Sequence, residues 1–196
     1  GADLVVHSAT KFLAGHGDVM AGAAAGRRDL IAAISSMQMH IGTVIDPHAA
    51  WLVLRGLKTL PLRMARQCAN ALEIAHFLKS QNDVTAVFYP WLAESDVARR
   101  QMTGGGGLLS FAVEGGDAAA RRLVNSLQLI PVATSLGGVE TVIEVPGDLD
   151  WSDETLRAGD DFTLPAGLIR LSAGIEPPNE IIADLERGLA SMRDGR

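Results

Sequence analysis

The order of apolar and polar residues divides the first sixty positions into two short strands followed by helices. Three aliphatic residues at 4–6 predict a buried strand. A run of small apolar residues at 19–25 predicts a second strand, packed closely on a neighbour. From Arg28 to Met39, apolar residues recur at helical spacing. Asp46-Pro47 is typical of another helix start, with Asp as the cap and Pro in the first helical position. Gly56 is expected to be a weak point of that helix, because glycine disfavours helical backbone.

A further helix is expected from Thr59 to about residue 79, with Pro61 tolerated in its first turn. Apolar residues follow helical spacing along one face, at Leu62, Ala65, Ala69, Leu72, Ala75 and Leu78. The opposite face is polar, with Arg63, Arg66, Gln67, Asn70, Glu73 and Lys79. Because charged and amide side chains are mostly exposed in folded proteins, we expect this polar face to be solvated.

From residue 84 onward, strands and helices alternate. The pattern predicts strands at 84–89, 108–113, 129–132, 139–145 and 168–172. Three helices are expected: a short polar one at 95–101, one capped by Asp117, and a final one capped by Asn179. In the final helix we expect apolar residues inside and polar residues outside: Ile181, Ile182, Leu185, Leu189 and Met192 inward, and Glu180, Asp184, Glu186 and Arg187 outward. This order predicts an α/β fold with a largely antiparallel sheet and helices on one face.

Two segments between these elements are interpreted as loops. The four glycines at 104–107 are expected to form a flexible turn, since no lysine or hydroxyl follows them at the spacing of a phosphate-binding loop. Residues 146–159 are expected to form an acidic loop or a short helix.

Composition and charge narrow the classes of function. The chain has 196 residues, 47% of them hydrophobic and 20% charged, as expected of a globular domain with a sizeable core. A net charge of −6 argues against nucleic acid and anionic membranes as partners, and no apolar run approaches the ~20 residues of a membrane helix. One cysteine, Cys68, and a start without a leader-like segment lead us to expect a cytoplasmic protein. No Cys/His cluster has the spacing of a metal site.

Lys11 is the first candidate for chemistry. It follows an apolar run and is flanked by Ser8 and Thr10. A desolvated lysine amine can form a Schiff base with a carbonyl compound, and neighbouring hydroxyls can bind an anion such as phosphate. The alternative is a surface lysine after a strand, with Ser and Thr as turn residues. The glycine spacing nearby matches neither a Walker sequence nor a dinucleotide-binding fingerprint.

Arg170 is the second candidate. It lies between apolar residues on a predicted strand, where a guanidinium can bind a carboxylate through two parallel hydrogen bonds. The alternative is a structural ion pair, with Glu140, Glu144 or Glu176 as partner. Structural ion pairs outnumber arginines that bind substrate, so the residue alone favours the structural pair. Ser135, in the segment before, is by itself interpreted as a turn residue.

Several strings match one known family in order and spacing. They include His7-Ser8-Ala9-Thr10-Lys11-Phe12, then Gly15-His16-Gly17-Asp18-Val19 and Gly22. Others are Ser135-Leu136-Gly137-Gly138-Val139-Glu140 and Arg170-Leu171-Ser172-Ala173-Gly174-Ile175-Glu176, with shorter matches at 51–60, 63–64, 89–90, 108–111 and 182–186. Across nearly its whole length the chain thus resembles the Cys/Met-metabolism (trans-sulfuration) family of pyridoxal-phosphate-dependent enzymes. The resemblance implies the aspartate-aminotransferase-like α/β fold, fold type I.

The resemblance also implies a role for each matched residue. Lys11 would be the catalytic lysine, holding pyridoxal 5'-phosphate as a covalent aldimine, and Ser8 and Thr10 would contact the cofactor phosphate. Ser135 and Arg170 would bind the α-carboxylate of an amino-acid substrate. Leu136 implies the γ-acting branch, because β-lyases of the family usually have tryptophan there. The implied reaction is γ-elimination or γ-replacement on sulfur amino acids or activated homoserine, by a homodimer or homotetramer.

The match is not complete. The family usually continues with His-Pro-Ala where this chain has Val145-Pro146-Gly147, and with Tyr-Pro-Gly-Leu where it has Tyr89-Pro90-Trp91-Leu92. These departures leave the substrate open. The resemblance implies that the chain is the C-terminal half: residues 1–45 would end the large cofactor-binding domain, 46–80 would be connecting helices, and 81–196 would be a small C-terminal domain.

Two alternatives to the enzyme hypothesis stay open. The family's N-terminal half supplies a ring-stacking tyrosine, an aspartate for the pyridine nitrogen and a phosphate loop, which we do not expect in this chain. The chain could therefore be a catalytically silent C-terminal fragment that folds or oligomerises without binding cofactor. It could also be a general anion-binding α/β module, whose phosphate binding would not depend on Lys11.

Overall fold

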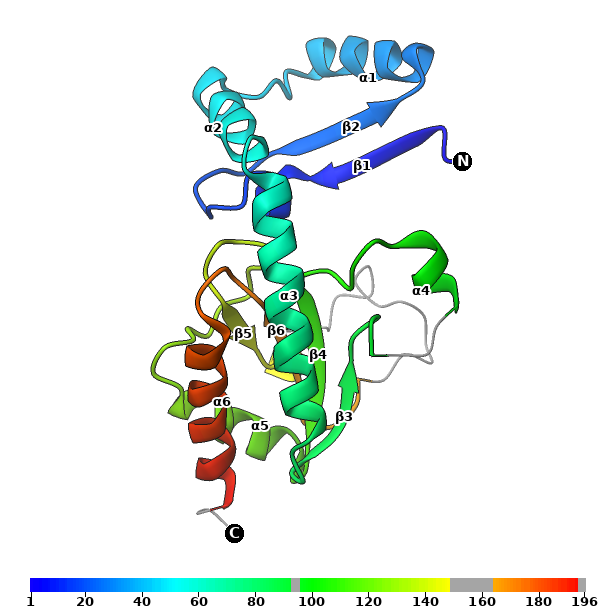
Figure 1. The fold of residues 1–196 in the computed structure, drawn as a ribbon. Coiled ribbons are helices and arrows are strands. Elements are labelled where there is room, and N and C mark those ends of the chain that lie inside the picture. Colours follow the sequence, from blue (N-terminus) through cyan, green and yellow to red (C-terminus); the bar gives the residue numbers. More distant parts are fainter. Residues whose placement is uncertain (93–95, 149–163, 194–196) are drawn as a thin grey trace. The chain divides into compact units, whose positions relative to one another are not determined.

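The computed structural model describes residues 1–92, 96–148 and 164–193 (Figure 1). The chain divides into two units, Gly1–Leu62 and Arg63–Arg196. Within the described ranges, the first unit has a two-stranded sheet and the second a four-stranded sheet. The boundary lies near the start of helix α3 (Leu60–Lys79), inside the segment 46–80 that we expected to connect two domains.

Strands β1 (Leu4–Ser8) and β2 (Gly22–Gly26) form the sheet of the first unit. They pair antiparallel, from Leu4 opposite Gly26 to Ser8 opposite Gly22. The strand at 4–6 was expected to be buried, and this is wrong: apart from Leu4, every residue of the two strands is exposed. Among the described residues this sheet has only two strands, and so small a sheet buries little of either face.

Helices α1 (Arg28–Ile41) and α2 (Pro47–Leu57) complete the first unit, and both confirm the predicted helices. Asp46 caps α2 as expected. Its Oδ1 accepts hydrogen bonds from the backbone N–H groups of His48 at 2.8 Å and Ala49 at 3.1 Å. These bonds satisfy donors that the first turn of a helix leaves without a partner.

Gly56, expected to be a weak point of α2, packs closely against a neighbouring turn. It is buried, and a Cβ at this position would lie 2.8 Å from the Cα atom of Ala14. Ala14 belongs to the turn that follows Lys11. Glycine therefore allows α2 to approach the backbone of that turn, at a position where its low helix propensity would otherwise be unfavourable.

The sheet of the second unit has the strand order β3-β4-β6-β5, with β3 (Val84–Phe88), β4 (Leu108–Val113), β5 (Val142–Glu144) and β6 (Leu168–Ser172). All three pairings are antiparallel, which confirms the expected sheet. The strand predicted at 139–145 is shortened to β5. The strand predicted at 129–132 does not form, and a single bridge between Val132 and Ile143 stands in its place.

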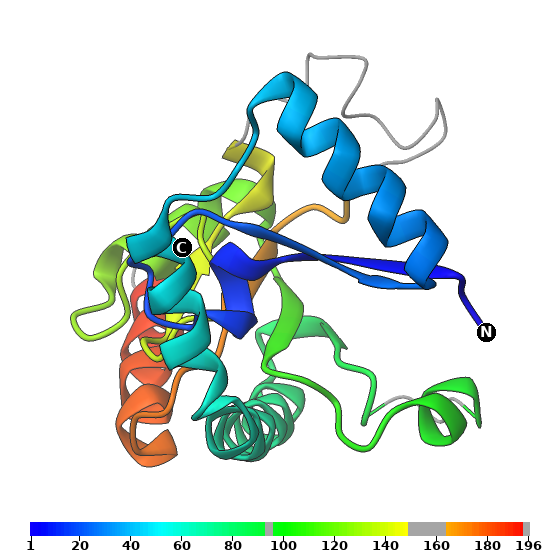
Figure 2. The ribbon, with the colours of Figure 1, turned by 90° about the horizontal axis from the view of Figure 1, so that it is seen from above.

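Helices α3, α5 (Gly116–Ser126) and α6 (Pro178–Arg193) pack on one face of this sheet (Figure 1), as expected. Figure 2 shows α3 almost end-on. Side chains from the strands and from these helices form one buried core, including Phe111, Ile169, Leu171, Ile74, Leu123 and Leu185.

The remaining described elements are α4 (Asp96–Gln101), which confirms the predicted short helix, and η2 (Pro146–Asp148). The rest of the loop expected at 146–159 lies outside the described residues.

Two of the expected helix caps are wrong. Gly115, in a left-handed conformation with φ of 88°, precedes α5, and Asp117 lies inside the first turn. The Asp117 carboxylate instead accepts a hydrogen bond from the backbone N–H of Gly167 at 2.7 Å. Asn179 lies inside α6, which begins at Pro178 because proline suits the first position of a helix.

Two helices match the expected inside and outside faces only in part. In α3, Arg63, Gln67 and Asn70 are only 4%, 0% and 1% exposed, whereas Leu62, expected inside, is 75% exposed. In α6, Asp184 is 2% exposed, although it was expected to face solvent. Its carboxylate accepts hydrogen bonds from the backbone N–H groups of residues 128–130. These bonds use the backbone donors of residues 129 and 130, so the segment meets the sheet only at the bridge between Val132 and Ile143.

Candidate functional site

Lys11 lies at the start of the segment that connects β1 to β2. Residues Ala9–Leu13 (η1) form one wide helical turn, in which Lys11 itself leaves helical backbone, with φ of −92° and ψ of −125°. The turn is closed by backbone hydrogen bonds from Ala14 N–H to the Ala9 carbonyl at 3.0 Å and from Gly15 N–H to the Lys11 carbonyl at 2.8 Å. Lys11 is half-buried. Its amine therefore extends from a backbone that hydrogen bonds hold on both sides.

The hydroxyls beside Lys11 have different surroundings. Thr10 Oγ1 donates to the Ala21 carbonyl at 3.3 Å and accepts from the Ala21 N–H at 2.9 Å, so its one proton is used within the turn. Ser8 is exposed, and its side chain makes no capping hydrogen bond to the turn that follows. An amine that can form a Schiff base and a nearby hydroxyl that can donate to phosphate are a donor set that fits pyridoxal phosphate.

Arg170 lies on the sheet face opposite the helices. Its neighbours in register are Ser110 on β4 and Glu144 on β5. The Arg170 Nη1 atom is 2.9 Å from Glu144 Oε1, so of the three carboxylates considered as ion-pair partners, Glu144 is the one in contact. The side chains of Arg170 and Glu144 are 21% and 5% exposed. Shielding from water makes such a pair stronger than one on the surface.

The guanidinium of Arg170 also anchors the loop that carries Ser135. Its Nη2 atom donates to the carbonyls of Thr134 and Ser135, both at 3.0 Å. Ser135 is exposed and Leu136 is half-buried. The structure therefore brings Ser135 and Arg170 together through the backbone of Ser135. A guanidinium has five N–H donors, so the three contacts with described residues leave two for another acceptor.

Sequence analysis missed two buried amides, one bonded to this loop and one to the segment after β6. Gln67 Nε2 donates to the Gly138 carbonyl at 2.6 Å, and Asn70 Nδ2 donates to the carbonyls of Gly174 and Glu176 at 3.0 and 2.8 Å. A signal for their burial was present in the sequence. Positions 63, 67 and 70 continue, at helical spacing, the stripe of positions 71, 74, 75 and 78 that packs on the core.

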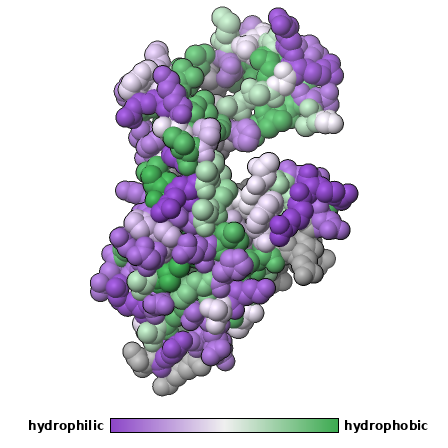
Figure 3. All heavy atoms as spheres, in the orientation of Figure 1, coloured by the Kyte–Doolittle hydropathy of each residue, from purple (hydrophilic) through white to green (hydrophobic). Residues whose placement is uncertain are grey.

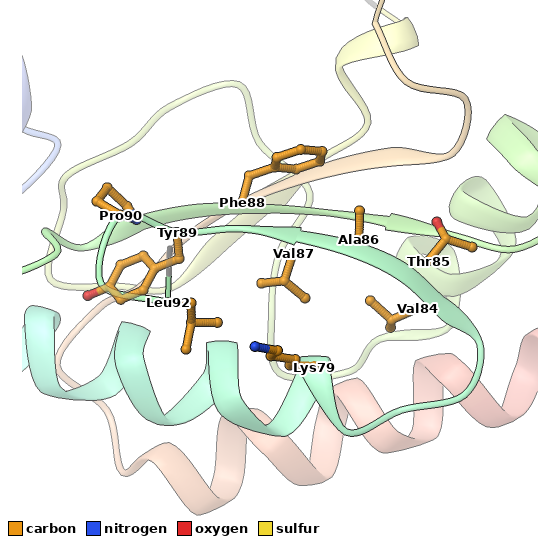
Figure 4. Close-up of a pocket in the computed structure, with 9 residues that line it drawn as sticks. All are labelled: Lys79, Val84, Thr85, Ala86, Val87, Phe88, Tyr89, Pro90 and Leu92. Atoms are coloured by element: carbon orange, nitrogen blue, oxygen red, sulfur yellow. The ribbon is translucent and has the colours of Figure 1, made fainter. Parts of the chain in front are cut away.

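The cavities of the second unit lie in different surroundings. One of about 230 Å³ is lined by Thr134 and Glu144, two contacts of Arg170. Another of about 660 Å³ runs along the edge strand β3, where Figure 4 shows Val87, Leu92 and Lys79 around it. None of the predicted site residues lines the second cavity.

Two further findings concern the described residues alone. No group of three or more His, Cys, Asp and Glu side chains is placed to hold a metal ion. No helix among them combines the length and the apolar character needed to cross a bilayer.

Comparison with known proteins places these features in a family. Residues 1–190 match the family of Cys/Met metabolism PLP-dependent enzymes. The chain is 43% identical to an L-methionine gamma-lyase from Pseudomonas putida, over 96% of the chain and 49% of that protein. It is 40% identical to a cystathionine beta-lyase from Lactococcus lactis subsp. cremoris, over 96% of the chain and 50% of that protein.

Among solved structures, the chain is similar to a cystathionine gamma synthase from Xanthomonas oryzae pv. oryzae in complex with aminoacrylate and cysteine. The TM-score is 0.93 at 38% identity, over all of this chain and 52% of that one. This likeness confirms the expected fold of type I pyridoxal-phosphate enzymes. The chain spans about half the length of the curated relatives it matches. It belongs to the Cys/Met metabolism family of PLP-dependent enzymes.

Proposed function

We propose that this chain supplies the catalytic lysine and the carboxylate-binding arginine of a pyridoxal-phosphate-dependent enzyme acting on sulfur amino acids or activated homoserine. The observation that carries the proposal is the half-buried Lys11 on a hydrogen-bonded turn, with the exposed Ser8 hydroxyl beside it. An amine held in this way can meet a carbonyl group in a defined direction. The names of the similar proteins, which include lyases and a synthase, support this class of reaction.

Each residue would have a separate task. Pyridoxal phosphate, when bound, supplies an electron sink for the electron pair released at the substrate's α-carbon. The Lys11 amine would remove and return the proton at that carbon. Ser8 would donate its hydroxyl proton to the phosphate, and Thr10 would keep the turn in place through Ala21. Arg170 would bind the substrate carboxylate through an N–H group outside these contacts, which orients the α-carbon's C–H bond.

We assign the reaction to γ-elimination or γ-replacement because Leu136, and no tryptophan, follows Ser135. Product analysis with cystathionine, methionine and O-succinylhomoserine distinguishes lyase from synthase, and a β-elimination product would contradict this assignment. We further propose that the enzyme works in the cytoplasm as a homodimer or homotetramer. The free thiol of Cys68 suits a reducing compartment.

The chain contains three lysines, Lys11, Lys58 and Lys79, which allows a sharp test of Lys11. The protein is incubated with less than one equivalent of pyridoxal phosphate, reduced with borohydride and digested, and the pyridoxyl-lysine adduct is located by mass spectrometry. We expect the adduct on Lys11. The Lys11→Ala variant should lose it, and the Lys58→Ala variant should keep it. Equal labelling of all three lysines would contradict the role of Lys11.

A second candidate function is a chain that folds and associates without binding cofactor. The exposed apolar side chains of the first unit favour it. The side chains of Val6, Met20, Met39 and Val44 are 71%, 88%, 80% and 66% exposed. Figure 3 shows hydrophobic residues, in green, on the surface of this unit. Large exposed apolar areas are typical of interfaces. Sedimentation that shows self-association, together with no preference for Lys11 in the labelling experiment, would favour this function over the enzymatic one.

A further inference from the structure

We propose that Gln67 and Asn70 are positioning residues, which hold the loop 133–141 so that Arg170 can bind a substrate carboxylate. This inference rests on the function proposed above for Arg170. It concerns residues of α3 that lie outside the predicted site. Neither amide touches the Arg170 guanidinium in the contacts described above, so both would act through the loop.

The loop 133–141 is fastened to the segment that follows β6, residues 173–176. The backbone N–H of Thr141 donates to Glu176 Oε1 at 2.6 Å, and its hydroxyl donates to Glu176 Oε2 at 2.9 Å. The same hydroxyl accepts from the Gly174 N–H at 2.9 Å. The N–H of Ile175 donates to the Val139 carbonyl at 2.8 Å. The two segments therefore form one hydrogen-bonded block.

Gly174 shows how closely the two segments approach. A Cβ at this position would lie 2.6 Å from the carbonyl carbon of Glu140. Side-chain carbons do not come this close to backbone atoms in folded proteins. The block consequently has little room to rearrange, and a change in one segment must displace the other.

Helix α3 holds this block from one side. Gln67 bonds the loop 133–141 through Gly138, while Asn70 bonds both Gly174 and Glu176 in the other segment. The Asn70 amide nitrogen lies between two carbonyl oxygens, so the amide can have only this orientation. Both side chains are buried, where water cannot replace a lost donor. Helix α3 therefore fixes the position of both segments of the block through these hydrogen bonds.

Arg170 depends on the block for two of its three described contacts. Its Nη2 atom donates to Thr134 and Ser135 in the loop, and its Nη1 atom contacts Glu144 on β5. If the loop shifts, the contacts to Thr134 and Ser135 weaken while the ion pair with Glu144 remains. The guanidinium then turns towards Glu144, and its free N–H groups no longer point in the direction required for a substrate carboxylate.

Substitutions that keep the side-chain shape nearly unchanged test whether Gln67 and Asn70 hold the loop, and whether the loop in turn orients Arg170. Asn70→Asp and Gln67→Glu replace an amide donor by a carboxylate oxygen, which repels the carbonyls it faces. Glu73→Gln is the matched control, because Glu73 is exposed on the same helix. Two readouts are needed. Hydrogen exchange at the amides of Gly137, Thr141 and Ile175 reports the loop, and the NMR signal of the Arg170 Nε–H during titration with L-methionine reports binding.

We expect exchange at these amides to accelerate about tenfold or more in Asn70→Asp and Gln67→Glu, and the affinity for L-methionine to fall by a similar factor. Amides in the pairing of β4 with β6 should keep their protection, and Glu73→Gln should behave like the parent. Unchanged exchange in the loop overturns the proposal. So does a loosened loop with unchanged affinity for L-methionine.

One further outcome separates this inference from the proposed function. If the Arg170 signal of the parent protein does not respond to L-methionine, the proposed role of Arg170 fails, and the positioning role for Gln67 and Asn70 fails with it. The exchange data then still show whether α3 supports the loop, as a purely structural contact. A response of the parent that the two variants lose, with the sheet intact, supports both proposals.

Discussion

Replacing Gly56 by alanine places a methyl group against the backbone of the turn that carries Lys11. The added Cβ would lie 2.8 Å from both the Cα and the carbonyl carbon of Ala14. Favourable carbon–carbon contacts lie at about 3.5–4.0 Å, so the two segments must separate by roughly 1 Å. Ala14 cannot move alone, because its N–H is bonded to the Ala9 carbonyl. The strain therefore reaches the turn around Lys11.

The magnitude follows from two opposing terms. Overpacking of this kind costs about 1–3 kcal/mol. Alanine in place of glycine stabilises a helix by up to about 1 kcal/mol, and by less here because Gly56 is next to the last residue of α2. We expect a net loss of about 1–2 kcal/mol, and a weaker pyridoxal-phosphate adduct on Lys11. Native-state hydrogen exchange in α2 measures the loss, with about tenfold faster exchange for each 1.4 kcal/mol.

Gly188→Ala is the matched control. Gly188 is also buried in a helix, but its added Cβ would meet the ends of flexible side chains, at 2.9 Å from Leu127 Cδ2 and 3.1 Å from Leu123 Cδ2. These ends can move aside, so the free energy of unfolding should change by less than about 1 kcal/mol. If Gly56→Ala is as stable as the parent or more so, the argument from close backbone packing is refuted.

Two further predictions concern pH. Burial, with a smaller effect of Cys68, raises the pKa of Tyr89 to about 12. Because Tyr89 is the one tyrosine of the chain, phenolate absorbance should titrate near that value in the folded protein and near about 10 in denaturant, and stability should fall as pH rises through this window. Burial alone would raise the pKa of Asp184, but three backbone N–H donors and Arg187 outweigh it and lower that pKa. Asp184 therefore stabilises the fold above the ordinary Asp pKa of about 4, and this contribution is lost as pH falls through the lower folded value. Urea unfolding against pH should show that loss, and a similar acid dependence in Asp184→Asn would contradict it.

Much of the architecture could be predicted because it depends on local patterns. The cap at Asp46, the helical spacing from Arg28 and the apolar run at 168–172 each specify an element through neighbours within a few residues. The antiparallel sheet follows from the order of such elements. The candidate residues Lys11, Ser135 and Arg170 were found through strings of residues, and their roles stay predictions until the experiments above are done.

Other features depend on contacts between distant residues, which local patterns do not contain. Gln67 and Asn70 are polar, and polarity favours exposure until carbonyls about 70 and 100 residues away in sequence are brought within hydrogen-bond distance. Asp184 similarly accepts from the backbone donors at 128–130, so the segment predicted as a strand at 129–132 pairs with the sheet only through one bridge at Val132. Glu144 could be distinguished from Glu140 and Glu176 as the partner of Arg170 only by the register of β5 on β6.

The sequence by itself determined the presence of most helices and strands, the antiparallel sheet of the second unit, and the family to which the chain is similar. These properties follow from residues close together in the chain, or from strings that can be matched directly. The tertiary structure decided which polar side chains are buried, why Gly56 is needed beside Ala14, and which carbonyls hold Arg170. The physical reason is that burial and hydrogen-bond satisfaction belong to the packed chain, and one residue type can be solvated in one setting and fully paired in another.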